Sequence, residues 1–298
     1  MREKLDTLLA ELRRLKKEGV SSVLLEENTL DQLAEQADRV RKSVSTAPKS
    51  EPVETQAKAQ ATLLPMEPAP VVHQAEKIVH DYHTLPSFEL PDGSKKERWD
   101  WLRERVLSCP VCNNHVKPGK KVVFGVGNID ADIFFCGEAP GADEEIEGIP
   151  FIGPAGQLLT RIISATGLTR EDVYIGNIMN WRPETDTPYG NRPPNQEEMD
   201  FCLPYLRAQV QVVQPKIIVA LGATAVNGLL GYNPKRSITR SRGEWHDFEG
   251  TPTIITYHPS YVLRNGTNRV KRQIWEDMLA VMERLSMPIS EKQRGYFL

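Results

Sequence analysis

A loop rich in carboxylates and glycines follows a strand-like apolar run near the middle of the chain. It reads GEAPGADEE over residues 137–145. A carboxylate at the tip of a strand can orient or activate a water molecule, and glycine lets the backbone approach a ligand closely. We interpret Asp143 and Glu145 as solvated, and Glu138 and Glu144 as candidates for catalysis.

Two further strand-like runs end in residues suited to a polar ligand. The first ends at Asn177, whose amide offers both the donor and the acceptor that recognition of a pyrimidine edge requires, although asparagine is also a common turn residue. The second is followed by His258, which Pro259 restricts to an extended conformation, so the imidazole leaves the strand tip in a fixed direction.

Strand-like and helix-like runs alternate over residues 87–298. The strand candidates are 122–124, 131–136, 173–177, 217–221 and 253–257. The helix candidates include 156–166, 196–213, 224–230 and 269–285. This alternation predicts an α/β fold, a three-layer α/β/α sandwich around a mostly parallel sheet of roughly four strands. Ligands bind beyond the carboxyl ends of such strands, where the residues above are found.

The first part of the chain differs in composition. Every Trp, Tyr and Phe of the 298 residues lies at or after Tyr82. We therefore divide the chain into a helical N-terminal arm (1–42), a Pro/Ala/Ser-rich linker (43–86) and a catalytic domain (87–298). The leucine stripe of the arm is consistent with a partner-docking helix, but a weak amphipathic helix without a defined role is the commoner explanation.

The overall composition restricts the class of protein. A formal net charge of −3 excludes wholesale basic attraction to nucleic acid but allows a local patch. Residues 232–272 contain eight basic and three acidic residues, which suits a phosphate track. No apolar run is long enough to span a membrane, and the N-terminus lacks a secretory signal, so we expect a cytoplasmic location.

Taken together, these segments resemble the uracil-DNA glycosylase superfamily, most closely its family 4, the bacterial and archaeal branch that usually carries an iron-sulfur cluster. Several ordered motifs carry the resemblance: GEAPGADE (137–144), PFIGPAGQLL (150–159), VYIGN (173–177), PKIIVALGATA (215–225), RGEW (242–245) and TYHPSYVLR (256–264). It implies hydrolysis of the N-glycosidic bond of uracil in DNA, after the nucleotide has been flipped into a pocket.

The resemblance also implies residue roles. Phe151 would stack on the base, Asn177 would pair with its polar edge, and His258 would donate to a carbonyl oxygen of the departing uracil. Glu144 would offset the charge on the sugar and position water, with Glu138 as the second choice. Further pocket-lining positions around Glu138 are Gly137, Ala139, Pro140 and Gly141.

The segment after His258 matches the loop with which this superfamily enters the DNA stack. We assign Ser260, Leu263 and Arg264 to DNA contact, with Leu263 as an apolar wedge and Arg264 as a phosphate contact. The implied partner is uracil-containing DNA. The core is expected to be monomeric, and the N-terminal helices would serve as a tether or protein-binding arm.

The cysteines depart from the family pattern. Cys109, Cys112 and Cys202 match three cluster ligands, but Trp181 occupies the place of the fourth. Because a 4Fe-4S cluster normally needs four ligands, we expect no complete cluster, while a three-cysteine site remains open. Cys136 and His115 are weaker substitutes. No cofactor is required for the chemistry, and any cluster would be structural.

Two other functions compete with this interpretation. An apparent insertion at 184–190 could alter the pocket rim, so the same scaffold could act on hypoxanthine or xanthine. A non-catalytic DNA-binding module is the rival from a different class, but such a module would not need both Glu144 and His258. No lysine nucleophile is apparent in the pocket motifs, so we predict a monofunctional enzyme without a lyase step.

Overall fold

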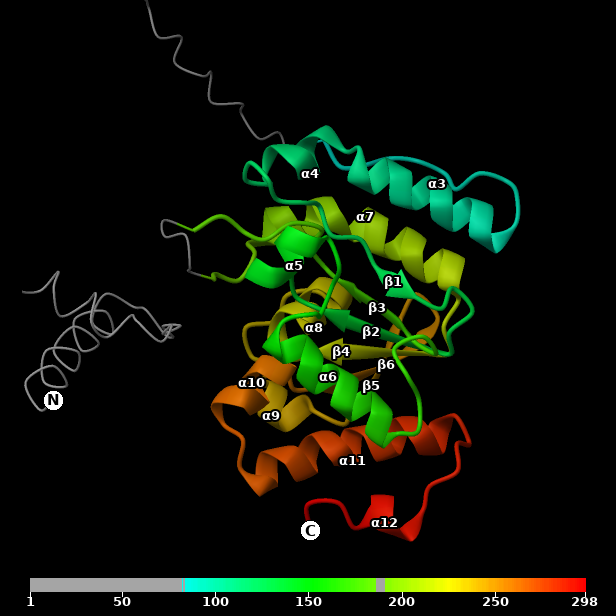
Figure 1. The fold of residues 1–298 in the computed structure, drawn as a ribbon, viewed down its shortest axis with the longest axis vertical. Coiled ribbons are helices and arrows are strands. Elements are labelled where there is room, and N and C mark those ends of the chain that lie inside the picture. Colours follow the sequence, from blue (N-terminus) through cyan, green and yellow to red (C-terminus); the bar gives the residue numbers. More distant parts are fainter. Residues whose placement is uncertain (1–81, 83, 186–190) are drawn as a thin grey trace, which may run out of the picture. The chain divides into compact units, whose positions relative to one another are not determined.

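The computed structural model describes residues 82, 84–185 and 191–298. The predicted arm (1–42) and most of the predicted linker (43–86) lie outside the described residues, as does most of the apparent insertion. The labels of Figure 1 are used below, and the first described helix is α3.

Six strands form one sheet in the order β1-β3-β2-β4-β6-β5 (Figure 1). Their bounds are Val126–Gly127 (β1), Ile133–Gly137 (β2), Tyr174–Asn177 (β3), Ile217–Leu221 (β4), Trp245–Phe248 (β5) and Thr251–Thr256 (β6). The four central strands run parallel, which confirms the predicted mostly parallel sheet. β1 and β5 add antiparallel edges that the sequence analysis did not predict.

The predicted strand at 122–124 is wrong. These residues precede β1 and lie outside the sheet, although all three are buried. Val123 donates from its backbone N–H to the carbonyl of Asn180 at 2.7 Å, and its carbonyl accepts from the Asn180 side-chain amide at 3.2 Å, so the segment is attached at one residue rather than by a ladder. Apolar residues predicted burial correctly here, but burial alone does not establish strand pairing.

Helices cover both faces of the sheet, which confirms the predicted three layers (Figure 1). On one face, Phe134 and Cys136 of β2 join the core formed with α3 (Lys95–Leu107), α7 (Gln196–Val213) and α8 (Gly222–Leu230). On the other face, Ile133 and Phe135 join the core formed with α6 (Pro154–Ala165) and α11 (Asn268–Arg284). Alternate side chains of a strand point to opposite faces, so one strand supplies both cores.

The shorter helices complete the domain. They are α4 (Pro110–Asn114), α5 (Ala142–Glu147), α9 (Ile238–Ser241), α10 (Pro259–Arg264) and α12 (Glu291–Arg294). Of the predicted helices, 196–213 matches α7 at both ends, because Asn195 and Glu198 form a capping box at its start. No described helix has the length and apolar character needed to cross a bilayer.

The register of the parallel strands decides where their ends lie. Gly137 is paired with Asn177 at the ends of β2 and β3, and Leu221 is paired with Thr256 at the ends of β4 and β6. The four carboxyl ends therefore meet at one edge of the sheet, and the segments that follow them begin there.

Candidate active site

A cleft of about 650 Å³ lies at this edge. Nearly all predicted site residues line it: Glu138, Ala139, Pro140, Gly141, Glu144, Phe151, Asn177, His258, Ser260, Leu263 and Arg264. Gly137 lies just behind this lining. A second cleft of about 710 Å³, between residues 86–93 and α7, contains none of these side chains. The tertiary structure thus brings together residues from 138 to 264 of the chain.

The inner wall of the cleft is formed by Phe151 and Asn177, both buried. A Cβ atom placed on Gly137 would lie 2.4 Å from both the Phe151 ring and Asn177 Oδ1, so only glycine fits between them. Among the described residues, Asn177 Oδ1 has no hydrogen-bond partner. A buried amide oxygen without a partner is costly, and a ligand that donates a hydrogen bond would satisfy it.

Glu144 of α5 is buried and lines the cleft. Its Oε1 accepts hydrogen bonds from the backbone N–H groups of Ile152, at 3.2 Å, and Gly153, at 3.1 Å. A Cβ atom on Gly141 would lie 2.5 Å from the other oxygen, Oε2, so only glycine allows the carboxylate to pack this close. One oxygen therefore holds the Phe151 loop, while Oε2 accepts no hydrogen bond from a described residue and Glu144 lines the cleft.

His258 follows β6 and caps α10. Its Nδ1 accepts from the backbone N–H of Ser260 at 3.1 Å, and the Ser260 hydroxyl lies 2.8 Å away. Since Nδ1 accepts, the ring hydrogen of the neutral tautomer is on Nε2. Burial, together with the nearby Arg264 charge, lowers the pKa of His258 from 6.5 to about 4. Its ring centroid is 5.7 Å from that of Phe151.

Glu138 is tied to a residue that the sequence analysis missed. Thr224, at the start of α8, donates from its hydroxyl to Glu138 Oε2 at 2.5 Å. Burial raises the pKa of Glu138, although the Thr224 hydrogen bond and the Arg264 charge oppose that rise. Thr224 lies within LGATA, just past the end of β4, so inspecting that fourth strand tip would have found it.

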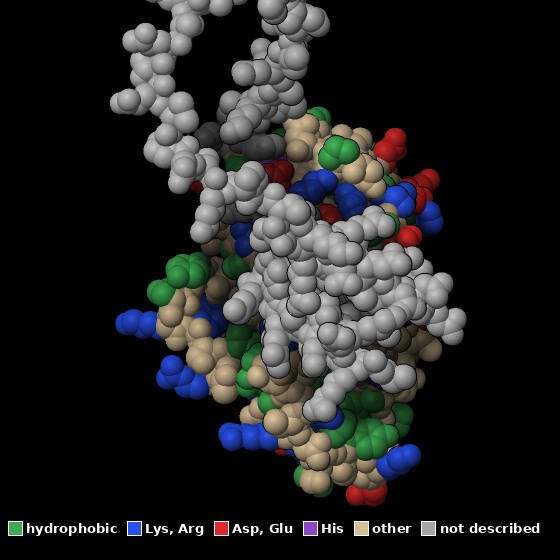
Figure 2. Space-filling model, turned by 60° about the vertical axis from the view of Figure 1, so that its left-hand side comes forward, with side chains coloured by type: hydrophobic (Ala, Val, Ile, Leu, Met, Phe, Trp, Pro, Cys, Tyr) green, Lys and Arg blue, Asp and Glu red, His purple; other side chains and the backbone are tan. Residues whose placement is uncertain are grey.

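The rim of the cleft carries Leu263 and Arg264 at the end of α10, and both are exposed. Figure 2 brings the α9–α10 side of the molecule forward and shows Lys and Arg side chains projecting from it. Asp143 is exposed, as interpreted. The solvated interpretation of Glu145 is wrong, because Glu145 is buried and forms an ion pair with Arg182 at 2.9 Å.

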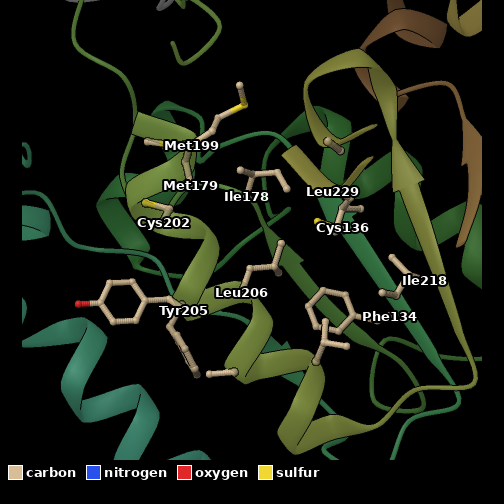
Figure 3. Packing of buried hydrophobic residues seen from close by; sticks show 14 of the residues in the cluster. Phe134, Cys136, Ile178, Met179, Met199, Cys202, Tyr205, Leu206, Ile218 and Leu229 are labelled. Carbon is tan, nitrogen blue, oxygen red and sulfur yellow. The ribbon is translucent and has the colours of Figure 1, made fainter. Parts of the chain in front are cut away.

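The cysteines lie away from the cleft. Cys109, Cys112 and Cys202 are all buried free thiols, and Cys109 and Cys112 are hydrogen-bonded to each other. Figure 3 shows Cys202 on α7 beside Met179 and Met199, well apart from Cys136 on β2. Cys136 is thus a buried core residue rather than a partner of Cys202.

Trp181 is fully buried within a stack of aromatic rings. Its ring lies 4.8 Å from the His115 ring at an interplanar angle of 13°, and His115 in turn stacks on Tyr82 at 5.0 Å. Phe201 of α7 meets Trp181 edge-on at 6.0 Å. We call Tyr82, His115, Trp181 and Phe201 the aromatic stack.

These residues do not fit a four-thiolate cluster. An indole has no lone pair suited to iron, and Trp181 Nε1 is buried with no hydrogen-bond partner among the described residues. Within the described part of the chain, no group of three or more His, Cys, Asp or Glu side chains could hold a metal ion. Trp181 therefore supplies no fourth thiolate beside the three cysteines that the resemblance implies as ligands.

Comparison with known proteins identifies the family of this chain. The model of the family described as the uracil DNA glycosylase superfamily matches residues 124–279. A type-4 uracil-DNA glycosylase of Thermotoga maritima is 42% identical over 186 residues, which cover 62% of this chain and 93% of that protein. The type-4 uracil-DNA glycosylase of Archaeoglobus fulgidus is 39% identical over 173 residues, covering 56% and 84% respectively.

A third relative extends this agreement. The type-4 uracil-DNA glycosylase of Saccharolobus solfataricus is 39% identical over 194 residues, which cover 63% of this chain and 86% of the relative. The matched family region contains every residue of the strand-tip cleft. The chain therefore belongs to the uracil DNA glycosylase superfamily, in its type-4 branch.

Proposed function

We propose that this protein hydrolyses the N-glycosidic bond of uracil in DNA and leaves an abasic site, the first step of base-excision repair. The observation that carries the proposal is the buried Asn177 amide, without a partner for its oxygen, beside the Phe151 and His258 rings. Its relatives bear the name uracil-DNA glycosylase. DNA supplies the base in a flipped-out nucleotide.

Base recognition follows from the wall of the cleft. Uracil presents an N3–H donor beside its O4 acceptor, and an asparagine amide matches that pair with its own oxygen and nitrogen. Phe151 offers a ring face for stacking, and the absent side chain at Gly137 keeps ring and amide close together. Recognition by a buried, otherwise unsatisfied amide favours bases that supply the matching donor.

Departure of uracil is assisted by His258. As the bond between C1′ and N1 breaks, the electron pair leaves with the base, and negative charge spreads to the carbonyl oxygens. The neutral imidazole, held by Ser260 with its hydrogen on Nε2, donates to that developing charge. A low pKa keeps the ring in this neutral donor form near pH 7.

Glu144 acts on the sugar side. The sugar gains oxocarbenium character, and a carboxylate beside it offsets that charge and orients a water molecule for attack at C1′. Glu144 is the better candidate than Glu138, because Oε2 of Glu144 accepts no hydrogen bond from a described residue, whereas Oε2 of Glu138 accepts one from Thr224. None of the described residues that line the cleft is a lysine, which supports attack by water rather than a Schiff base.

The basic stretch 232–272 divides into structural and available cations. Arg242 pairs with buried Asp277, Arg236 donates to Asn227 and Gly231, and Arg272 donates to the carbonyls of residues 294 and 296. The other five form no ion pair with a described residue: Lys235, Arg240, Arg264, Arg269 and Lys271. These five side chains lie before and after Leu263 in the sequence. We propose that they contact the DNA phosphates, and we call them the phosphate track.

The cofactor proposal concerns structure only. Hydrolysis of the glycosidic bond uses the cleft residues above and requires no electron transfer. With three thiols and the indole of Trp181, we infer that the protein holds no complete 4Fe-4S cluster. The aromatic stack occupies the core around Trp181 and supplies packing of its own.

Substitution of the two reacting side chains tests the proposal. With an end-labelled oligonucleotide containing one uracil, followed by alkali, the parent protein is expected to reveal strand cleavage without added metal. His258→Ala is expected to lower the rate about 100- to 1,000-fold by removing a donor to the leaving group. Glu144→Gln, which keeps an oxygen for Ile152 and Gly153 but removes the charge, is expected to lower it at least about 100-fold.

Glu147→Gln is the matched control, because Glu147 is exposed on the same helix, and it is expected to retain the parental rate. Binding of the uracil strand by the parent without any cleavage would contradict the proposal and favour a non-catalytic module.

The protonation state of His258 can be measured directly. Its pKa, followed by NMR of the imidazole protons with His258→Gln for assignment, is expected near 4, because the ring is buried. The pH-dependent stability that this ring contributes is present above about 6.5 and is lost as the pH falls toward about 4. Arg264→Ala is expected to raise the pKa without restoring the ordinary value. A pKa near 6.5 in the parent would contradict the effect of burial, and a pKa well above about 7 would contradict a neutral donor.

Salt dependence tests the phosphate track. For a DNA strand carrying an abasic site, the slope of log K against log salt is expected to fall by about 1 in Arg264→Ala and again in Arg240→Ala, because each removes one phosphate contact. Arg103→Ala, an exposed arginine on α3, is the control and should leave the slope unchanged. Unchanged slopes in both cleft-side variants would contradict the assignment.

Metal analysis tests the cofactor proposal. Protein purified without oxygen is expected to contain far fewer than four irons and four acid-labile sulfides per chain. Trp181→Cys restores the fourth thiol and is expected to raise both values, whereas Trp181→Phe should not. Four irons and four sulfides per parental chain would overturn the inference.

A further inference from the structure

Two side chains form hydrogen bonds with the backbone of the loop that carries Phe151, one from each side. One of these two side chains has no role in the proposed mechanism. We infer that Arg170 is a positioning residue for Phe151, acting through the backbone of the loop to hold the ring where a flipped base would stack. This inference rests on the proposed function. Arg170 lies in the turn between α6 and β3 and does not line the cleft.

Phe151 needs such support because of its backbone. Its φ is 54°, in the left-handed region that side chains other than glycine rarely adopt. An isolated loop would relax from this conformation and move the ring. The surrounding structure must therefore impose it.

Arg170 supplies two of the required contacts. Nη1 donates to the carbonyl of Phe151 at 2.8 Å, and Nη2 donates to the carbonyl of Pro150 at 2.9 Å. Nη1 also lies 3.3 Å from the Thr160 hydroxyl, which joins the guanidinium to α6. The guanidinium is planar, and its N–H donors point in fixed directions. Two adjacent backbone carbonyls that both accept hydrogen bonds from it therefore cannot rotate freely.

The contacts from the other side act on the next two residues. Glu144 accepts from the N–H groups of Ile152 and Gly153, so the loop's carbonyls are held by a cation and its amides by an anion. Gly156 leaves room for the Phe151 backbone, since a Cβ atom at position 156 would lie 1.8 Å from the Phe151 carbonyl oxygen. The ring is thereby fixed against Gly137 and 5.7 Å from the His258 ring.

Two explanations for an effect of Arg170 must be separated. Its charge interacts with that of Glu144, so it could act electrostatically on the reacting carboxylate. Arg170→Lys keeps the positive charge but cannot reproduce the planar fork. Arg170→Gln removes the charge and the fork together. If position matters, both variants lose activity; if only charge matters, Arg170→Lys does not.

A double-mutant cycle with Phe151→Ala tests the inference on the full chain. Single-turnover release of uracil is measured for the parent, Arg170→Gln, Phe151→Ala and the double variant, with thermal unfolding recorded for each. Arg170→Gln is expected to lower the rate about 100-fold in the parent, as a displaced contact does. In the Phe151→Ala background it should change the rate by no more than about twofold, because the ring it positions is gone.

Arg170→Lys is expected to lose about tenfold, between the parent and Arg170→Gln, and Arg161→Ala, an exposed arginine on α6, should behave as the parent. Equal losses in both backgrounds, or a fully active Arg170→Lys, would overturn the inference. So would failure of both Arg170 variants to fold, because the role would then be structural. A parent that releases no uracil would instead contradict the proposed function.

Discussion

The parallel register of four short strands is the constraint on which the rest of this structure depends. Gly137 stands opposite Asn177 and Leu221 opposite Thr256, so residues far apart in the chain leave the sheet at one edge. A shift of one residue in any of these pairings would turn every side chain of that strand to the opposite face. Asn177 would then lose its place beside Phe151, and the cleft would lose its base-reading wall.

The loops beyond that edge combine support and chemistry in the same side chains. Glu144 lines the cleft and holds the Phe151 loop through one oxygen, while its other oxygen accepts no hydrogen bond from a described residue. His258 uses Nδ1 to cap α10, which leaves Nε2 as the donor. A side chain with both a structural and a chemical role is placed precisely, because a reacting group that is already held by a structural hydrogen bond loses little conformational freedom when the substrate binds.

Phe151 and Trp181 pack against opposite faces of the sheet. Phe151 belongs to the core formed with α6 and α11, whereas Trp181 belongs to the core formed with α3 and α7. The aromatic stack around Trp181 therefore lies in a layer separate from the one that contains Phe151.

The sequence by itself predicted the layers and the parallel centre of the sheet, and it placed Glu138, Glu144, Asn177 and His258 at strand tips, because periodicity and strand-tip residues are local signals. The other predicted cleft residues, such as Phe151 and Leu263, came from the family resemblance. The predicted helix 196–213 coincides with α7, whose start is fixed by a local capping box between Asn195 and Glu198. Only the tertiary structure decided the edge strands β1 and β5, the burial of Glu145 with Arg182, the bond from Thr224 to Glu138 and the grip of Arg170 on Phe151. Each of these features depends on two residues that are far apart in the chain. The spacing of residues along the sequence does not predict which distant residues will be in contact.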